Sequence, residues 1–286
     1  MSDLNDAVKN ATLHQIVQGD ARNLGSIASE SVHLVCSSPP YADLIHYSDH
    51  PDQLGGIDDY ESFLVEMDKV LEELSRVLIP GGRIAFVVGD VCVSRRAGGR
   101  HHVLPLAADL QSRSRRFGLD NLTPIRWLKV ANVKMEASRS SRFLGKPNLP
   151  NGVIKNDIET IIFLRKKGYR KPTPEMENLS RIPTDEYVKL FAPIWTDVKG
   201  QLRRDHPAPY PVEIPARLIR MFSFVGDTVL DPFAGTGTTA FAAGALGRNS
   251  INVEIEERYV ALMRARLQRA KLQLSGDLQL AKLAAE

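Results

Sequence analysis

A strand, a glycine turn and a helix follow one another near the carboxyl end of the chain, and this arrangement narrows the fold more than any other feature. Thr228-Val229-Leu230 is an apolar run that leads into Asp231-Pro-Phe-Ala-Gly-Thr-Gly-Thr-Thr239, and Ala240–Leu246 has helical character. Gly235 and Gly237 permit positive φ and let the backbone approach a ligand closely. The helix behind them offers free N–H groups to a carboxylate or phosphate. The segment predicts a nucleotide-binding α/β unit.

A carboxylate follows at the place where such a unit binds ribose hydroxyls. Ser250–Val253 is an expected strand, and Glu254 ends it, 17 positions after Gly237. A NAD-binding fold prefers three glycines, and Ala240 stands at the third position, which that pattern tolerates. Dinucleotide binding is therefore disfavoured but stays open. A tight strand-helix turn without a ligand is the other interpretation of these residues.

A second motif lies near the amino end, where the apolar run Val32–Cys36 leads into Ser38-Pro39-Pro40-Tyr41. Neither proline can donate to a sheet ladder, so the strand must stop there. The following proline also pushes Ser38 out of the helical region. The result is a stiff turn with a hydroxyl, two carbonyls and an aromatic ring. These groups suit a flat amine that donates hydrogen bonds while a ring stacks on it, although Pro-Pro-Tyr alone is equally typical of a surface turn.

The rest of the chain alternates between expected strands and helices. Further strands are expected at His14–Gly19, Arg83–Gly89, Leu122–Val130 and Ile158–Leu164, and further helices at Val103–Phe117, Val212–Phe222 and Glu256–Leu272. Asp58 is the expected cap of another helix, which runs to about Leu78 with seven apolar residues at helical spacing. Ala131–Asn156 and Lys171–Gln201 show no period and are expected to be irregular. The order of elements predicts a parallel α/β sheet.

Positive charge is concentrated in the middle of the chain. Residues 91–204 contain 23 Lys and Arg against 10 Asp and Glu, a net charge of +13, whereas the remaining residues contain 14 against 24. A basic block between acidic flanks favours contact with a polyanion, and nucleic acid is preferred to a merely solvated surface. The loop with Arg95, Arg96 and Arg100 is the first candidate for phosphate contact.

Composition excludes several other classes of protein. No apolar run approaches the roughly 20 residues that span a bilayer, and the polar start of the chain is not a signal peptide. Cys36 and Cys92 are expected to be reduced and buried, which fits a cytoplasmic protein. The seven histidines show no metal-ligand spacing, so no metal is expected.

Together, the Ser38–Tyr41 and Asp231–Thr239 motifs resemble those of the S-adenosylmethionine-dependent DNA amino-methyltransferases. That family has a (Ser/Asp/Asn)-Pro-Pro-(Tyr/Phe) motif and a Phe-x-Gly-x-Gly motif. The order here, with the basic region between the motifs, resembles the beta class. Gly19-Asp20-Ala21, Leu78–Gly82 and His206–Pro211 resemble further segments of the family. The resemblance covers roughly Gln15 to Leu272, except the middle.

The resemblance implies a doubly wound, mostly parallel methyltransferase sheet of Rossmann-like type with a basic, irregular target-recognition insertion. Residues 1–130 would form the catalytic half of the core, and 131–204 a core strand with the DNA-binding insertion. Residues 205–275 would form the cofactor-binding half, and 276–286 a tail.

The resemblance also implies the roles of individual residues. The catalytic candidates are Ser38, Pro39, Pro40 and Tyr41; the candidates for S-adenosyl-L-methionine are Asp20, His206, Asp231, Phe233, Gly235, Thr236, Gly237, Thr238 and Glu254; the candidates for DNA are Arg95, Arg96, Arg100, Arg139, Arg142 and Lys146. The target base must be flipped out of the duplex. Ser38 and the Pro39 carbonyl would accept the amine hydrogens, and Tyr41 would stack on the base. Gly237→Val is expected to abolish cofactor binding and to leave the fold intact.

Ser rather than Asp at position 38 favours N4 of cytosine as the methylated atom, because Ser-Pro-Pro-Tyr accompanies cytosine more often in the family. A hydroxyl can also accept from the amine and donate elsewhere. The alternatives are adenine N6, an RNA base, a protein glutamine, a nicotinamide enzyme, and a non-catalytic nucleic-acid-binding protein. Double-stranded DNA is the expected partner, no membrane is expected, and a homodimer and a cognate restriction endonuclease are left open.

Overall fold

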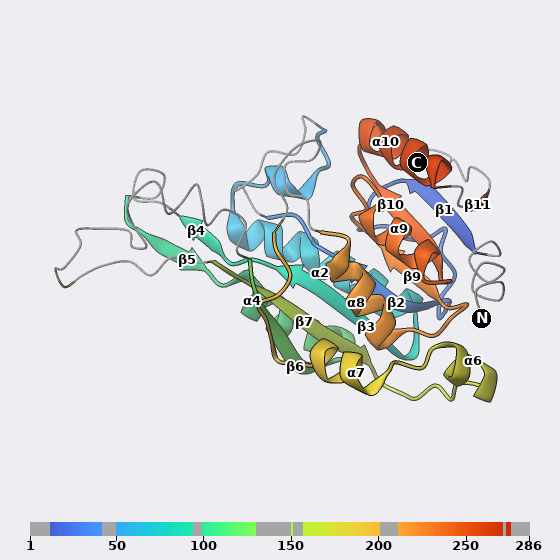
Figure 1. Ribbon diagram of the computed structural model, residues 1–286. Coiled ribbons are helices and arrows are strands. Elements are labelled where there is room, and N and C mark those ends of the chain that lie inside the picture. The colour runs from blue at the N-terminus through green and yellow to red at the C-terminus, as the bar shows by residue number, and fades with distance from the viewer. Residues whose placement is uncertain are drawn as a thin grey trace.

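The computed structural model describes residues 12–41, 50–93, 99–129, 150, 157–200, 211–270 and 273–275. Within them a nine-stranded sheet forms the centre of the molecule (Figure 1). Its strands are β1 (Leu13–Gln18), β2 (Val32–Ser37), β3 (Leu78–Val88), β6 (Leu119–Leu128), β7 (Ile158–Lys166), β8 (Ile194–Trp195), β9 (Thr228–Asp231), β10 (Asn249–Glu254) and β11 (Gln273–Ser275).

The order of strands places the two sequence motifs side by side. The sheet runs β11-β1-β10-β9-β2-β3-β7-β6-β8. All neighbours that the structure describes are parallel except β3 with β7 and β6 with β7. The chain order reverses between β9 and β2, whose register pairs Leu34 with Val229 and Val35 with Leu230. In an open α/β sheet, such a reversal leaves a crevice at the carboxyl ends of the two strands.

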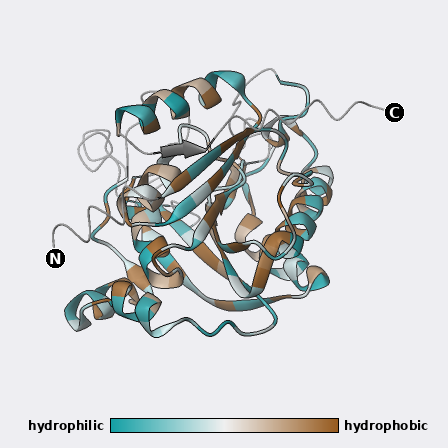
Figure 2. Ribbon diagram, turned by 90° about the vertical axis from the view of Figure 1, so that its right-hand side faces the viewer, coloured by the Kyte–Doolittle hydropathy of each residue, from teal (hydrophilic) through white to brown (hydrophobic). Residues whose placement is uncertain are grey.

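Helices cover both faces of the sheet, as the doubly wound prediction requires. One face packs against α2 (Tyr60–Val77) and α4 (Leu106–Ser114), and the other against α8 (Glu213–Phe222), α9 (Thr238–Ala245) and α10 (Glu257–Arg269). Val35 points to the first face, and Leu34 and Cys36 point to the second. Figure 2 shows hydrophobic residues along the central strands and hydrophilic residues on the outer sides of the helices. This alternation buries both faces of β2, the strand that ends at Ser38.

Helix α2 begins one residue later than the sequence suggests. Its N-cap is Asp59, whose carboxylate accepts the backbone N–H of Ser62, so the prediction of Asp58 as the cap is wrong. The helix buries its apolar stripe, including Phe63, Met67 and Leu71, against the sheet. It leads directly into β3, whose first residues Leu78–Gly82 continue as strand rather than as a separate turn.

Two segments differ from the sequence-based expectation. The stretch 171–201 is not irregular throughout, because it contains α6 (Pro174–Leu179), α7 (Thr184–Leu190) and β8. The expected helix at Val103–Phe117 begins only at Leu106 and ends in a 3-10 turn, η2 (Arg115–Phe117). His102–Leu104 instead forms β5, which pairs with β4 (Val91–Val93) in a small antiparallel sheet at the left of Figure 1. Pro105 lies between β5 and α4.

The cysteines are free, and they differ in exposure. Cys36 is buried in β2, where burial raises the pKa of its thiol, whereas Cys92 in β4 is only half-buried. The expectation that both are buried is therefore wrong for Cys92. Of the helices that the structure describes, none has the length and apolar character of a bilayer-spanning segment.

Candidate active site

An open cleft with about 940 Å³ of empty space lies where β1, β2, β9 and β10 end. Its walls come from four segments: 19–21, 38–40, 52–55 (with the 3-10 turn η1, Leu54–Gly56) and 232–259. The lining residues are Gly19, Asp20, Ala21, Ser38, Pro40, Asp52, Gln53, Leu54, Gly55, Pro232, Phe233, Ala234, Gly235, Thr236, Thr238, Glu254, Ile255, Glu256 and Tyr259. Residues of both sequence motifs therefore line one cleft.

Ser38 lies at this cleft with its hydroxyl fixed. Its Oγ donates to the backbone carbonyl of Val87 in β3 at 3.0 Å. A hydroxyl has one hydrogen and two acceptor lone pairs, so this bond leaves Ser38 an acceptor toward the cleft. Pro39 is buried behind Ser38, and Pro40 reaches the cleft wall. The bond to Val87 therefore fixes the direction of the Ser38 hydroxyl.

Tyr41 is held against the end of β3. Its hydroxyl accepts the backbone N–H of Gly89 at 3.3 Å, and its side chain is 8 % exposed. A Cβ at position 89 would lie 3.4 Å from Tyr41 Cε1 and 3.6 Å from Glu159 Cγ. These are ordinary van der Waals distances, so the tyrosine ring lies close to residue 89 without requiring glycine there. Glu159 accepts from Lys129 Nζ at 2.5 Å, which places an ion pair beside this ring.

Asp231 connects the two motifs from behind the cleft wall. Its Oδ1 accepts the hydroxyl of Ser37 at 2.6 Å and the N–H of Phe233 at 3.1 Å. The residue is 2 % exposed and is not part of the cleft lining. Burial raises its pKa to about 6, although the hydrogen bonds from Ser37, Thr239 and Phe233 oppose the shift. The hydrogen bond between Asp231 and Ser37 joins β9 to the residue before Ser38. The sequence suggests a cofactor contact for Asp231, but this side chain does not line the cleft.

Gly235 and Glu254 form the floor of the cleft together. Gly235 has a φ of 51°, and its N–H donates to Glu254 Oε2 at 2.7 Å. The other oxygen of Glu254 accepts the N–H of Glu256 at 2.9 Å. Burial raises the pKa of Glu254, and these two N–H groups oppose that shift. Glu254 thus lines the cleft at its predicted place and also holds the glycine turn against β10.

Gly237 lies where α9 packs against α10, and it is not part of the cleft lining. It is the N-cap of α9 with a φ of 78°. A Cβ there would lie 2.5 Å from Cγ of Met263 in α10, which is buried. The expectation that Gly237→Val leaves the fold intact is therefore wrong, because the new side chain would collide with α10.

Several residues in or beside the cleft belong to no motif that can be recognised in the sequence. Arg266 of α10 donates through Nη1 to the Thr236 carbonyl at 3.3 Å and to Thr238 Oγ1 at 3.1 Å, which fixes the glycine turn from outside. Asp52–Gly55 line the cleft without a recognisable pattern, and Tyr259 lines it too. The sequence indicates Tyr259 only through its position on the helix that is expected after Glu254.

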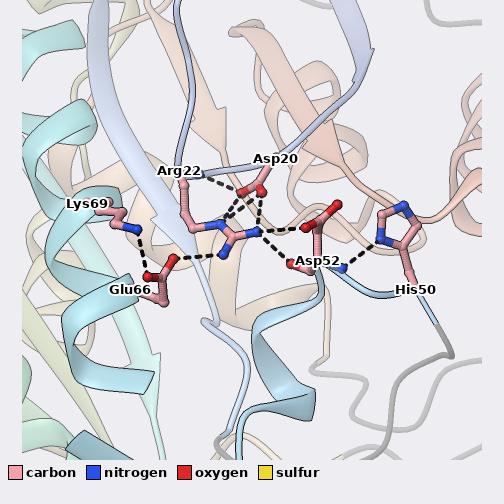
Figure 3. Close-up of polar contacts among 6 residues, drawn as sticks. All are labelled: Asp20, Arg22, His50, Asp52, Glu66 and Lys69. Atoms are coloured by element: carbon pink, nitrogen blue, oxygen red, sulfur yellow. Dashed lines mark hydrogen bonds and ion pairs between the residues drawn. The ribbon is translucent and has the colours of Figure 1, made fainter. Parts of the chain in front are cut away.

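Asp20 lies at the cleft, as predicted, and its carboxylate is held by Arg22 (Figure 3). Among the candidates for DNA contact, Arg100 is exposed just before β5. The candidates that lie outside the described residues are Arg95, Arg96, Arg139, Arg142 and Lys146, together with the cofactor candidate His206.

Known proteins resemble this chain over most of its length. Residues 32–265 match the model of the DNA methylase family N6_N4_Mtase. The chain is 35 % identical over 279 residues to the type II methyltransferase M.MjaI of Methanocaldococcus jannaschii, covering 86 % of this chain and 88 % of that protein. M.MthZI of Methanothermobacter thermautotrophicus is 30 % identical, with coverage of 95 % and 81 %. The crystal structure of TTHA0409 from Thermus thermophilus with S-adenosyl-L-methionine has a TM-score of 0.76 and 46 % identity, covering 92 % of this chain and 98 % of that chain.

Proposed function

This chain belongs to the DNA methylase family of N6 and N4 amino-methyltransferases, and we propose that it transfers a methyl group from S-adenosyl-L-methionine to N4 of a flipped-out cytosine in double-stranded DNA. The methyltransferase class and its cofactor follow from the family. The observation that carries the proposed chemistry is that Ser38 and the Phe233–Thr238 turn line the same cleft. A methyl donor on the turn would therefore lie within reach of an amine held at Ser38.

The residues of the cleft fit the parts of the cofactor. The glycine turn and the start of α9 form a backbone-lined floor, which suits close approach of a ligand. Glu254, at the end of β10, would bind the ribose hydroxyls, and Asp20, at the end of β1, would accept from the amine of adenine; both residues line the cleft. When bound, S-adenosyl-L-methionine supplies a methyl group on a positively charged sulfur. His206 stays a prediction from the sequence.

The catalytic turn acts by positioning the amine. The lone pair of an exocyclic amine is conjugated into the ring, which makes the amine a poor nucleophile. Ser38 and the Pro39 carbonyl would accept hydrogen bonds from its two N–H groups and so favour a pyramidal nitrogen, whose lone pair then points out of the ring plane. Tyr41 is 8 % exposed and is not part of the cleft lining, so its stacking on the base stays a prediction from the sequence. Positioning and hydrogen bonding, rather than a covalent enzyme intermediate, would supply most of the rate.

The preference for cytosine rests on the Ser-Pro-Pro-Tyr pattern. The hydrogen of Ser38 is donated to Val87, so donation to a ring nitrogen of the base would require this bond to break. The hydroxyl therefore supports acceptance from an amine in general, and it does not by itself select cytosine over adenine.

Nucleoside mass spectrometry tests the assignment. Genomic DNA that lacks methylation would be incubated with the protein and isotopically labelled cofactor, digested and analysed. We expect labelled N4-methylcytosine. Labelled N6-methyladenine without N4-methylcytosine would overturn the choice of base. No labelled base, together with intact calorimetric binding of S-adenosyl-L-methionine, would contradict the catalytic assignment.

A further inference from the structure

Arg22 lies behind the cofactor cleft and connects three separate segments of the chain (Figure 3). Its Nη2 donates to Asp20 Oδ2 at 2.6 Å and to the Asp52 carbonyl at 2.9 Å. Its Nη1 donates to Glu66 Oε2 of α2 at 2.7 Å. Asp20 and Asp52 both line the cleft, whereas Arg22 itself does not. Hydrogen bonding to Asp20 is the main cause that raises the pKa of Arg22 above its ordinary value.

The bonds from Arg22 leave the carboxylate of Asp20 with little spare capacity. Oδ1 accepts the backbone N–H of Arg22 at 2.8 Å and shares the Nε hydrogen, with Nε 3.0 Å from Oδ1 and 2.8 Å from Oδ2. With the Nη2 hydrogen, three N–H groups of one residue bind two oxygens that accept about four hydrogen bonds together. About one acceptor position remains, and the side chain is 30 % exposed. Arg22 therefore sets the orientation of the Asp20 carboxylate, which lines the cleft.

Arg22 also fixes a neighbouring segment of the cleft wall. Asp52 begins the cleft-lining segment 52–55, in which Leu54 is buried in the core. The bond from Arg22 to the Asp52 carbonyl holds this segment at a set distance from Asp20. The bond to Glu66 anchors both walls to helix α2, and Lys69 holds the other oxygen of Glu66 at 2.6 Å. Four of the five guanidinium hydrogens are used by these contacts.

We propose that Arg22 is a positioning residue for recognition of the cofactor's adenine amine: it orients Asp20 so that one acceptor position faces the cleft, and it holds the neighbouring wall segment at Asp52. This inference rests on the proposed cofactor role of Asp20. It predicts that Arg22 affects how strongly the protein prefers a ligand with the adenine amine to one without it. A residue with only a structural role would change stability and leave that preference unaltered.

The chain offers a matched control in Arg76. Arg76 binds both oxygens of Glu73 at 2.8 and 2.9 Å and the Leu24 carbonyl at 2.8 Å, so it connects a neighbouring loop to the same helix by the same chemistry. None of these three residues lines the cleft. Arg76→Lys therefore removes a comparable guanidinium fork at a site without cofactor contact, while Arg22→Lys removes the fork that orients Asp20.

The experiment compares two ligands by calorimetry: S-adenosylhomocysteine and S-inosylhomocysteine, in which a carbonyl oxygen replaces the adenine amine. We expect the parent to prefer the adenosyl ligand about tenfold or more, because the inosyl oxygen would face the carboxylate of Asp20. Arg22→Lys should reduce this ratio about three- to tenfold, and Asp20→Asn should abolish most of it. Arg76→Lys should keep the parental ratio, even where thermal unfolding shows lower stability.

The outcomes separate the inference from the proposed function. A parent protein that binds both ligands equally would overturn the role of Asp20, and the inference with it. A parental ratio that is unchanged in Arg22→Lys but lost in Asp20→Asn would overturn the role of Arg22 and leave the proposed function standing. An equal loss in Arg76→Lys would also contradict the inference, because the effect would then be general.

Discussion

Asp231 holds a carboxyl group where water does not reach. Its pKa of about 6 is raised by burial, since the surrounding protein stabilises the charged form less well than water does. A carboxyl group with a higher pKa in the folded than in the unfolded chain stabilises the fold most at low pH. That contribution is lost as the pH rises through the folded pKa. Burial of the Asp231 carboxylate therefore costs stability at neutral pH, and the hydrogen bonds from Ser37, Thr239 and Phe233 offset part of that cost.

Asp231→Asn tests this sign. Asparagine keeps an oxygen that accepts from Ser37 and does not titrate. We expect the free energy of unfolding of the variant, minus that of the parent, to increase by up to about 3 kcal/mol as the pH rises from about 4 to about 7. Denaturant titrations at a series of pH values measure this difference. A difference that stays flat or decreases over the range would contradict the account.

The test uses the difference in free energy of unfolding between the variant and the parent, because a second buried group changes stability with pH in the opposite direction. Burial lowers the pKa of His14 to about 4, so His14 makes the fold less stable as the pH falls from about 6.5. This effect is common to the parent and to Asp231→Asn, and it cancels when the two curves are subtracted.

At the scale of elements, the sequence predicted the strands and helices that carry long patterns. The apolar runs of β2 and β9 and the long stripe of α2 are found close to their expected bounds, whereas β3 begins at Leu78, five residues before its expected start. The elements α6, α7 and β8 were missed because six, seven and two residues are too few to show a period. Their conformation depends on contacts with distant segments, such as the pairing of Trp195 in β8 with Trp127 in β6.

The packing of α9 against α10 explains Gly237 and gives a prediction. Gly237→Ala should lower the free energy of unfolding by about 2–4 kcal/mol, because a left-handed backbone and a collision with Met263 act together. Gly118 has a similar φ of 72°, and a Cβ there meets nothing within 4 Å. Gly118→Ala should therefore cost only about 1 kcal/mol. Thermal or denaturant unfolding of the two variants measures the comparison, and equal costs would contradict the role of the Met263 contact.

At the scale of the whole molecule, the sheet order brings together residues that the sequence separates widely. Ser37 and Asp231 are 194 positions apart and share a hydrogen bond of 2.6 Å. The two motifs could be found in the sequence because each is a local turn with its own chemistry. Arg22, Arg266 and Asp52 could not, because their roles depend on which segments the fold places beside them.

The uneven charge of the chain predicts how it binds DNA. Residues 91–204 carry a net charge of +13. Affinity for a DNA duplex should therefore fall steeply with salt. The slope of log affinity against log salt concentration should be about −0.9 for each phosphate that the protein neutralises. Arg100→Ala should reduce that slope by about 1. Lys167 is exposed after β7, at the end of the sheet opposite the cleft, so Lys167→Ala should leave the slope unchanged.

Fluorescence anisotropy with a labelled duplex at several salt concentrations measures these slopes. A flat salt dependence of the parent would remove the basic region as the DNA-binding surface. An equal change in Arg100→Ala and Lys167→Ala would show that the contacts are not confined to the face that holds the cleft.

The central claim is that Ser38 activates the amine in a cleft whose floor holds the cofactor, and single-turnover methyl transfer by Ser38→Ala tests it most directly. We expect the rate to fall about 100-fold or more, because one hydrogen bond to the reacting amine is lost. Calorimetric affinity for S-adenosyl-L-methionine should stay within about threefold of the parent, since the glycine turn is intact. Ser38→Thr, which keeps the hydroxyl, should recover part of the rate. Transfer by Ser38→Ala at the parental rate would contradict the account.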